Sequence, residues 1–285
     1  MTAAEQSSIA KRTRLLAEAP AFRPVAMQLL KLVRSSSQSL TEIVTLLRSD
    51  AVLTGEVLRL ANSPLFATRC EIKNVLQALA FLGLDRINAM VLTTVIRGLV
   101  DGRRGSFTHS CWRHNLATGL ICQRLSAAAC LPQERCYVAG LIHDIGRLAL
   151  LRVFPEYEQA MIQAESGGDD LLARERELFD VDHAEAGRWL LSQWGCPLEL
   201  QNVAAWHENP QNTVSCDRPL ICLVHAASQL ADLMAMSVFP SIPRADLPEI
   251  VDWLPAKAGE HVLDTFPEMV EWVETKVNEI ELSLT

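Results

Sequence analysis

The stretch Ala139-Gly-Leu-Ile-His-Asp-Ile-Gly-Arg-Leu148 sets a histidine beside an aspartate inside an otherwise apolar segment. Burying two ionisable side chains costs free energy unless each has a partner. On a helix, neighbours such as His143 and Asp144 project about 100° apart, so they converge only at a point close to the backbone, and Gly146 carries no side chain there. A divalent cation suits such a point, because it accepts an imidazole nitrogen and a carboxylate oxygen together. The alternative interpretation is a core histidine, with Asp144 an ordinary helix-terminus or paired carboxylate.

The overall charge of the chain narrows the classes of partner. Its 285 residues include 26 lysines and arginines against 34 aspartates and glutamates, a net charge of −8. Nucleic acids and anionic membranes bind concentrated basic surfaces, so this balance argues against both as general partners. Arg97, Arg103 and Arg104 form only a small basic cluster. The apolar share of 49% is ample for a core, in one large domain or two modest ones.

Cysteine usage and the lack of a targeting pattern predict a cytoplasmic protein. No Cys-x-x-Cys pair occurs among the eight cysteines, which we interpret as reduced, buried thiols rather than a disulfide framework or zinc ribbon. Residues 1–20 carry charges without an apolar signal-peptide core. The longest weakly charged run, residues 219–243, contains Asp232 and is closed by prolines, which favours a buried helix over a membrane span.

The first hundred residues predict a module of short helices, because apolar residues recur at helical spacing and no alternating strand pattern is evident. Helix starts are expected near Pro24, at the capping box Ser39-Leu-Thr-Glu42, after Asp50, after Asn74 and at Asp85. Gly83 is placed to end one helix, and Ala61-Asn-Ser-Pro64 has the composition of a turn. This module has no buried histidine, carboxylate pair or glycine-rich phosphate loop.

Residues 101–106, Asp-Gly-Arg-Arg-Gly-Ser, have the composition of a linker. We therefore divide the chain into an N-terminal helical module over 10–104, a helical core over 105–240 and a C-terminal helical tail over 241–285. The helix expected from about Thr108 to Ala128 is apolar on two sides, which predicts a central, buried helix. His114 lies on one of those sides and should be buried.

Further polar residues are expected within or at the ends of apolar helices. Asp182-His-Ala-Glu185 is a second capping box and places His183 at the start of a helix, whereas Trp206-His-Glu208 places His207 at the end of another. One stripe of the 219–236 helix is polar and must face either water or an internal polar site; its members are His225, Ser228, Gln229 and Asp232.

These residues resemble a known family. The order His114, His143-Asp144, Asp232 is similar to the H…HD…D metal-ligand pattern of the HD superfamily of metal-dependent phosphohydrolases, which is all-helical. Within that superfamily the chain resembles the HDOD subgroup more closely. The resemblance lies in five segments: Arg48-Ser-Asp50, Leu58-Arg-Leu-Ala-Asn-Ser-Pro64, Val75-Leu-Gln-Ala-Leu-Ala-Phe-Leu-Gly83, Trp112-Arg-His114 and Gly140-Leu-Ile-His-Asp-Ile-Gly146. The resemblance covers roughly residues 18–237. It implies an all-α fold, a multi-helical HD-like domain preceded by an N-terminal helical module packed against it.

The resemblance also implies a metal site. The ligands would be His114, His143, Asp144 and Asp232, with His183 and His207 where the related HD-GYP phosphodiesterases place further ligands. The ion would be divalent iron, manganese, zinc or magnesium, and the catalytic candidates would be His143, Asp144 and Arg147. The chain departs from the HD-GYP pattern in three respects. No Gly-Tyr-Pro follows His207, and Trp206 stands where HD-GYP proteins have the first histidine of a His-His pair. Arg147 replaces the lysine of their HDxGK string.

Two hypotheses of function stand at this point. HDOD domains are generally regarded as output or scaffolding domains of bacterial signal transduction, so the leading hypothesis is a regulatory module that acts through protein partners. In it, the histidine and aspartate cluster is either metal-filled and structural or a relic without metal. The alternative is a metal-dependent phosphohydrolase acting on a nucleotide or cyclic dinucleotide. The sequence leaves the oligomeric state open.

Overall fold

The protein is helical throughout the residues that its computed structural model describes, which are 40–63, 71–100, 105–167, 170–239 and 245–284. No strand occurs among them, which confirms the all-α prediction. The helix expected near Pro24, Ser39 of the first capping box, Pro64 of the turn and residues 101–104 of the linker lie outside these ranges. The helices are α3 (Leu40–Arg48), α4 (Ala51–Ala61), α5 (Val75–Leu82), α6 (Leu84–Arg97), α7 (Phe107–Leu125), α8 (Gln133–Ile142), α9 (Ile145–Val153), α10 (Tyr157–Gly167), α11 (Leu171–Phe179), α12 (His183–Gln193), α13 (Leu198–Trp206), α14 (Arg218–Leu233), α15 (Leu247–Val251) and α16 (Ala256–Ser283), with a 3₁₀ turn at Pro210–Asn212.

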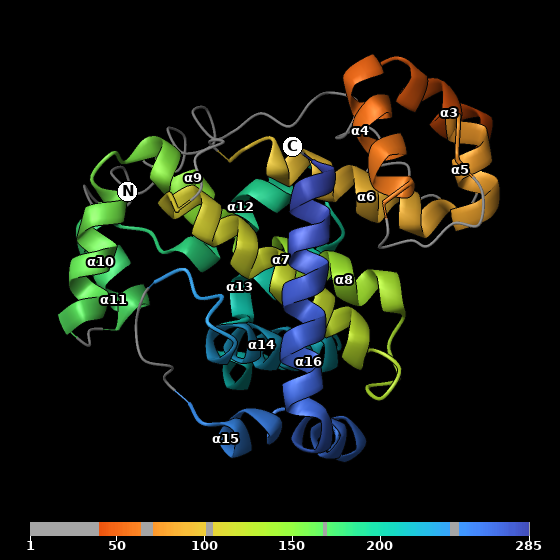
Figure 1. Ribbon diagram of the computed structural model, residues 1–285. Helices are drawn as coiled ribbons and strands as arrows, with labels where there is room; N and C mark the ends of the chain where they lie inside the picture. The colour runs from red at the N-terminus through yellow and green to blue at the C-terminus, as the bar shows by residue number, and fades with distance from the viewer. Residues whose placement is uncertain (1–39, 64–70, 101–104, 168–169, 240–244, 285) are drawn as a thin grey trace.

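The four helices α3 to α6 form the upper right part of the molecule in Figure 1. The expected caps are present: the Asp50 side chain accepts a hydrogen bond from the Leu53 N–H, and Asn74 accepts one from the Gln77 N–H. Gly83 ends α5 with a φ of 80°, and α6 begins directly after it, one residue before the expected start at Asp85. These local caps fix the helix ends without help from distant residues.

Helix α7 is the central element, as its two apolar sides predict, and packs against both α8 and α14. Two glycines bring α7 and α8 together: a Cβ built on Gly140 would lie 2.8 Å from the Cα of Gly119. Because the helices approach backbone to backbone, the His114 and His143 rings come within 5.3 Å of each other, centroid to centroid. The glycine contact thus helps set the spacing of the site.

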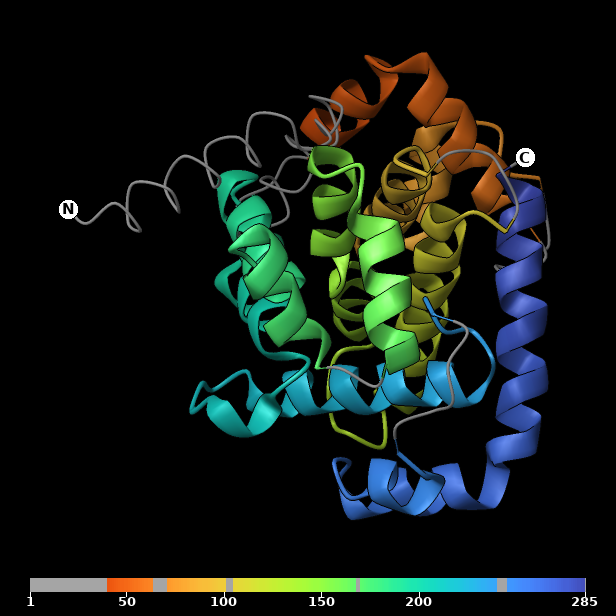
Figure 2. The same cartoon turned by 90° about the vertical axis from the view of Figure 1, so that its left-hand side faces the viewer.

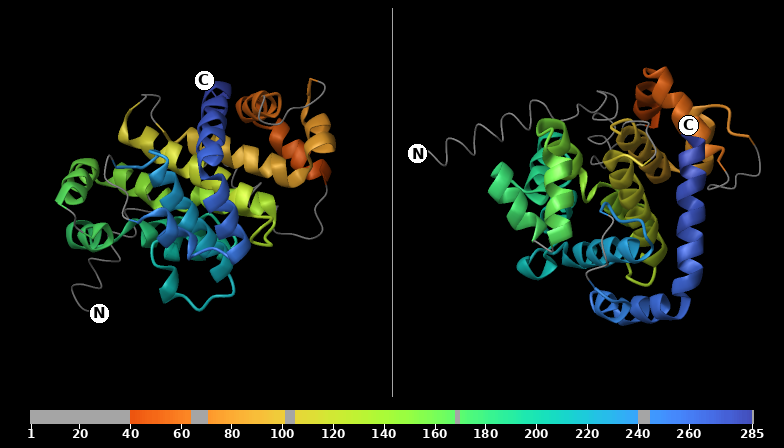
Figure 3. Two further views of the ribbon diagram at one scale, coloured as in Figure 1. Left: turned by 60° about the horizontal axis from the view of Figure 1, so that its bottom comes forward. Right: turned by 60° about the vertical axis from the view of Figure 1, so that its left-hand side comes forward.

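The last part of the chain is helical, as predicted, and α16 packs along α7. Its buried side includes Met269, Val273 and Val277. Near its end Glu281 forms ion pairs with Arg113 and His109 of α7. Figures 2 and 3 show α16 running along one side of the molecule after a kink near Pro267. The far end of α16 contacts α4, so this helix touches both the N-terminal module and the core.

The structure also bears on the expectations about membrane spans and cysteines. None of the described helices combines the length and the apolar character needed to cross a bilayer. The described cysteines are all free, but Cys130 and Cys216 are exposed and Cys222 is half-buried, so the expectation of buried thiols is wrong for these three.

Candidate metal centre

His143 and Asp144 lie at a break between two helices rather than within one. Helix α8 ends at Ile142 and α9 begins at Ile145, with Asp144 in a non-helical conformation before it. The separation of about 100° expected for neighbours in one helix therefore does not apply. The role expected of Gly146 is also different: a Cβ there would lie 1.8 Å from the His183 carbonyl oxygen. Gly146 makes room for the start of α12, not for an ion, and so places His183 at the site.

The structure brings five of the predicted ligands into two adjoining groups. One group is His114, His143 and Asp144, and the other is Asp144, His183 and His207. All are buried, and within each group the ligand atoms lie within 4.8 Å of one another. All of them except His183 line a cavity of about 100 Å³ at the junction of α7, α9 and α14. Because Asp144 belongs to both groups, the arrangement has the form of two neighbouring cation positions that share a carboxylate.

Two of the imidazoles are oriented by backbone carbonyls. The His143 Nδ1 donates to the Gly140 carbonyl at 2.6 Å, and the His207 Nδ1 donates to the Ala204 carbonyl at 3.0 Å. Each ring therefore presents the lone pair of its Nε2, as metal-binding histidines commonly do. Burial, reinforced by His207 and His114, lowers the pKa of His143 well below its usual value, and burial lowers the pKa of His207 as well. Both shifts favour the neutral ring that ligation requires.

Two polar atoms of the cluster have no hydrogen-bond partner, although they are buried. They are the Asp144 Oδ1 and the His207 Nε2. A buried acceptor without a partner costs about 1–3 kcal/mol, and a cation would remove that cost. The residues present therefore fit a divalent ion.

Asp232 lies at the rim of the cluster. Its Oδ1 is 3.4 Å from the His114 Nδ1, which also donates to the Met236 carbonyl at 3.1 Å. Its side chain is 36% exposed and belongs to neither group of ligand atoms. The whole polar stripe of α14 nevertheless lines the cavity, which shows that it faces an internal polar site; the members are His225, Ser228, Gln229 and Asp232.

Arg147 lies inside the centre with only 5% of its surface exposed. Each of its three nitrogens faces a different carboxylate: Nε contacts Asp144 Oδ2, Nη1 is 3.5 Å from Glu175 Oε1, and Nη2 is 3.2 Å from Glu208 Oε1. Burial alone would lower the pKa of the guanidinium, but Asp144 and the other surrounding acidic groups outweigh burial and raise that pKa. Arg147 is therefore a permanent internal cation.

Glu175 and Glu208 were not predicted from the sequence. Glu175 is fully buried, and its Oε2 is 2.7 Å from the His183 Nδ1 and accepts the His183 backbone N–H at 2.8 Å. Burial and Arg147 would lower the pKa of His183, but Glu175 and Asp144 outweigh them and raise it to about 10. Burial would raise the pKa of Glu175, and His183 outweighs it, giving a value of about 2. A sequence signal did exist, because Glu175 lies between Leu171 and Phe179 at helical spacing on the buried side of α11.

Comparison with known proteins supports the resemblance. The family model of the HDOD domain matches residues 19–210. An uncharacterized protein of Treponema pallidum is 24% identical over 250 residues, a match that covers 84% of this chain and 47% of that protein, so the chain spans about half the length of this relative.

Two solved structures are similar over nearly the whole chain. One is an HDOD domain protein of unknown function from Geobacter sulfurreducens, with a TM-score of 0.79, 20% identity, and coverage of 97% of this chain and 99% of that one. The other is a Shewanella amazonensis protein provisionally named a phosphohydrolase, with a TM-score of 0.74, 21% identity, and coverage of 97% and 98%. At these identities the likeness shows a shared all-helical fold.

Proposed function

The chain belongs to the HDOD family, and on that premise we propose that it is a regulatory module of a signalling pathway that works through protein contacts. Its metal centre then has a structural role. We propose protein partners rather than nucleic acid or membrane, in keeping with the net charge of −8.

The observation that carries this proposal is the charge around the cavity. Four carboxylates line it, those of Asp144, Glu165, Glu208 and Asp232, against the single lining arginine, Arg147. That guanidinium is already paired with three carboxylates. Phosphoryl transfer depends on cationic groups that are free to bind and position phosphate oxygens. A phosphodiester would instead meet carboxylates and an arginine whose charge is already paired with three carboxylates.

His114, His143 and Asp144 are the residues that would hold a divalent ion in this proposal. Such an ion, when bound, offsets the charge of the buried carboxylate and supplies the Lewis acidity that hydrolases of this superfamily use. Here its role would be to join residues from α7 and the α8–α9 break. Binding to the native state then adds stability by mass action.

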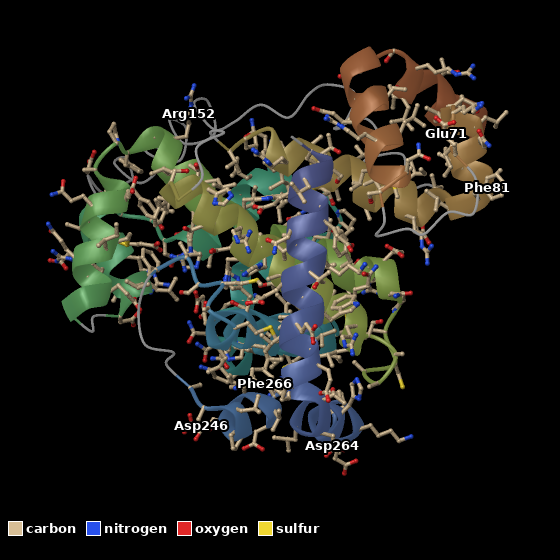
Figure 4. The ribbon with its side chains drawn as sticks, in the orientation of Figure 1. Glu71, Phe81, Arg152, Asp246, Asp264 and Phe266 are labelled. Carbon is tan, nitrogen blue, oxygen red and sulfur yellow. The ribbon has the colours of Figure 1, made fainter. Side chains whose placement is uncertain are left out.

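A surface for protein contact is available on α5. Leu76 and Phe81 are 58% and 61% exposed, although both are large apolar side chains. Figure 4 labels Phe81 at the outer edge of the α3–α6 part of the molecule, and none of the residues that line the cavity belongs to these helices. We propose that these two exposed apolar side chains form part of the contact surface.

The test combines an activity assay with complementation. Purified protein with manganese, magnesium or ferrous iron is assayed against a generic phosphodiester and cyclic di-GMP, and we expect no turnover. In the source organism, the double variant Leu76→Ser/Phe81→Ser should fail to complement a deletion, whereas Leu263→Ser, a matched change of an exposed leucine on α16, should complement. Turnover that disappears in Asp144→Ala, together with failed complementation by that variant, would overturn the proposal.

The second candidate function is a metal-dependent phosphohydrolase. It is favoured by one observation, the pair of ligand groups that share Asp144, because two adjoining metal ions clamp the attacking and leaving oxygens in many phosphohydrolases. The same assay decides between the two functions.

A further inference from the structure

The second ligand group, Asp144, His183 and His207, has a guanidinium beside it. We infer that Arg147 takes the place of a second metal ion, so that the centre of this chain binds one divalent ion fewer than its ligand groups would allow. This inference concerns the metal centre of the proposed function and does not depend on which protein the module contacts.

The position of the guanidinium is the first argument. The His183 Nδ1 is bonded to Glu175, which leaves Nε2 as the atom that would bind an ion. The Arg147 Nη2 lies 3.3 Å from that Nε2, and the Arg147 Nε contacts Asp144 Oδ2. A divalent ion binds an imidazole nitrogen at about 2.0–2.1 Å. An ion at that distance from the His183 Nε2 would therefore lie against a positively charged group.

The arrangement of the carboxylates is the second argument. Asp144, Glu175 and Glu208 come from three separate parts of the chain: the α8–α9 break, α11 and the bend after α13. Each meets a different nitrogen of Arg147, with Glu175 at 3.5 Å and Glu208 at 3.2 Å. A planar guanidinium spreads its donors in three directions, whereas a metal ion draws its ligands towards one point. The carboxylates are thus placed to bind an arginine.

The first ligand group, His114, His143 and Asp144, differs from the second in its contacts with Arg147. No described contact joins Arg147 to His114 or His143, whereas the Arg147 Nη2 lies 3.3 Å from the His183 Nε2 of the second group. The His143 Nε2 is presented by the bond from its Nδ1 to the Gly140 carbonyl. The guanidinium therefore contacts a histidine of the second ligand group and no histidine of the first.

The experiment counts ions. Wild-type protein and variants are purified in manganese, desalted and analysed for manganese per chain. Arg147→Ala should hold one more ion than wild type, because the position becomes vacant and three carboxylates lose their counter-charge. Arg147→Lys keeps a cation and should match wild type. Arg152→Ala is the matched control: Arg152 is an exposed arginine on the same helix, which Figure 4 shows on the outside of the molecule.

Electron paramagnetic resonance supplies a readout that does not depend on stoichiometry. Wild type should give the spectrum of an isolated manganese ion, and Arg147→Ala that of a coupled pair sharing Asp144. If Arg147→Ala does not fold, Arg147→Gln replaces it, since glutamine removes the charge and keeps part of the volume. Two ions in wild type, or equal counts in wild type and the charge-removing variant, would overturn the inference. Turnover of a phosphodiester would overturn the proposed function and leave the ion count unaffected, so the two failures are distinguishable.

Discussion

Replacing Gly140 by alanine tests the backbone contact between α7 and α8. The added Cβ would lie 2.8 Å from the Gly119 Cα, the Gly119 nitrogen and the Thr118 carbonyl oxygen. All three are backbone atoms, so no side-chain rotation can relieve the contact. Reaching the 3.4 Å of ordinary contact requires the helices to move apart by about 0.6 Å. Overpacking of a core costs about 1–3 kcal/mol, and the upper end applies because two helices must shift together.

The better helix propensity of alanine offsets about 1 kcal/mol of that cost, which leaves a net loss of about 2 kcal/mol. For a chain of this size the loss corresponds to a fall in Tm of roughly 3 °C. Differential scanning calorimetry measures it. Gly55→Ala is the control, because a Cβ at this exposed position of α4 meets nothing within 4 Å, and its Tm should stay the same or rise. A Gly140→Ala protein that melts at or above the wild-type temperature would refute the reasoning.

Three further changes follow from the geometry. Asp144→Ala should lower the Tm of metal-loaded protein and abolish the effect of a chelator on the melt; identical melts for both proteins in both conditions would argue against a bound ion. The Glu175 and His183 pair should stabilise the fold most between pH 4.5 and 6.5, the ordinary pKa values of the two groups, and lose its contribution as pH rises towards the folded His183 value of about 10. Urea midpoints between pH 6 and 10 should therefore fall more steeply for wild type than for Glu175→Gln, and equal slopes would contradict the pairing. Asn62→Ala removes the side-chain hydrogen bonds to the Ile72 N–H at 2.7 Å and the Ile72 carbonyl at 2.8 Å. The free energy of unfolding, measured by urea denaturation, should fall by about 1–3 kcal/mol. Asn62→Asp should lie between wild type and Asn62→Ala, because it keeps the acceptor.

Helix ends were predictable where the signal is local. Asp50, Asn74 and Asp182 each accept a hydrogen bond from the backbone N–H three residues later, as their sequence positions indicate. The break between Ile142 and Ile145 has a weaker local signal: Asp144 is a residue type that can begin a helix, but its side chain forms no capping hydrogen bond and the segment 139–148 has no proline. Packing of α9 against α12 accompanies the break, and that contact joins residues far apart in the sequence.

The candidate site was predictable to a similar extent. The metal-ligand pattern implied by the family resemblance named residues that the structure does bring together, such as His114, His143 and Asp144. Glu175 was missed because an isolated glutamate is most often solvated, and only its position on a buried helix side marks it. The prediction that Gly146 leaves room for an ion was wrong. The backbone of α12 occupies that space, which no local sequence pattern reveals.

The contact between α7 and α16 has a consequence for how the chain is made. Arg113 and Glu281 are separated by 168 residues, yet they pair directly. A ribosome adds about 5–20 residues each second, so roughly 10–30 s pass between the synthesis of the two partners. During that interval the side of α7 that later receives α16 is exposed to other nascent chains and to chaperones. The core must therefore remain partly exposed along α7 until α16 is synthesised and packs against it.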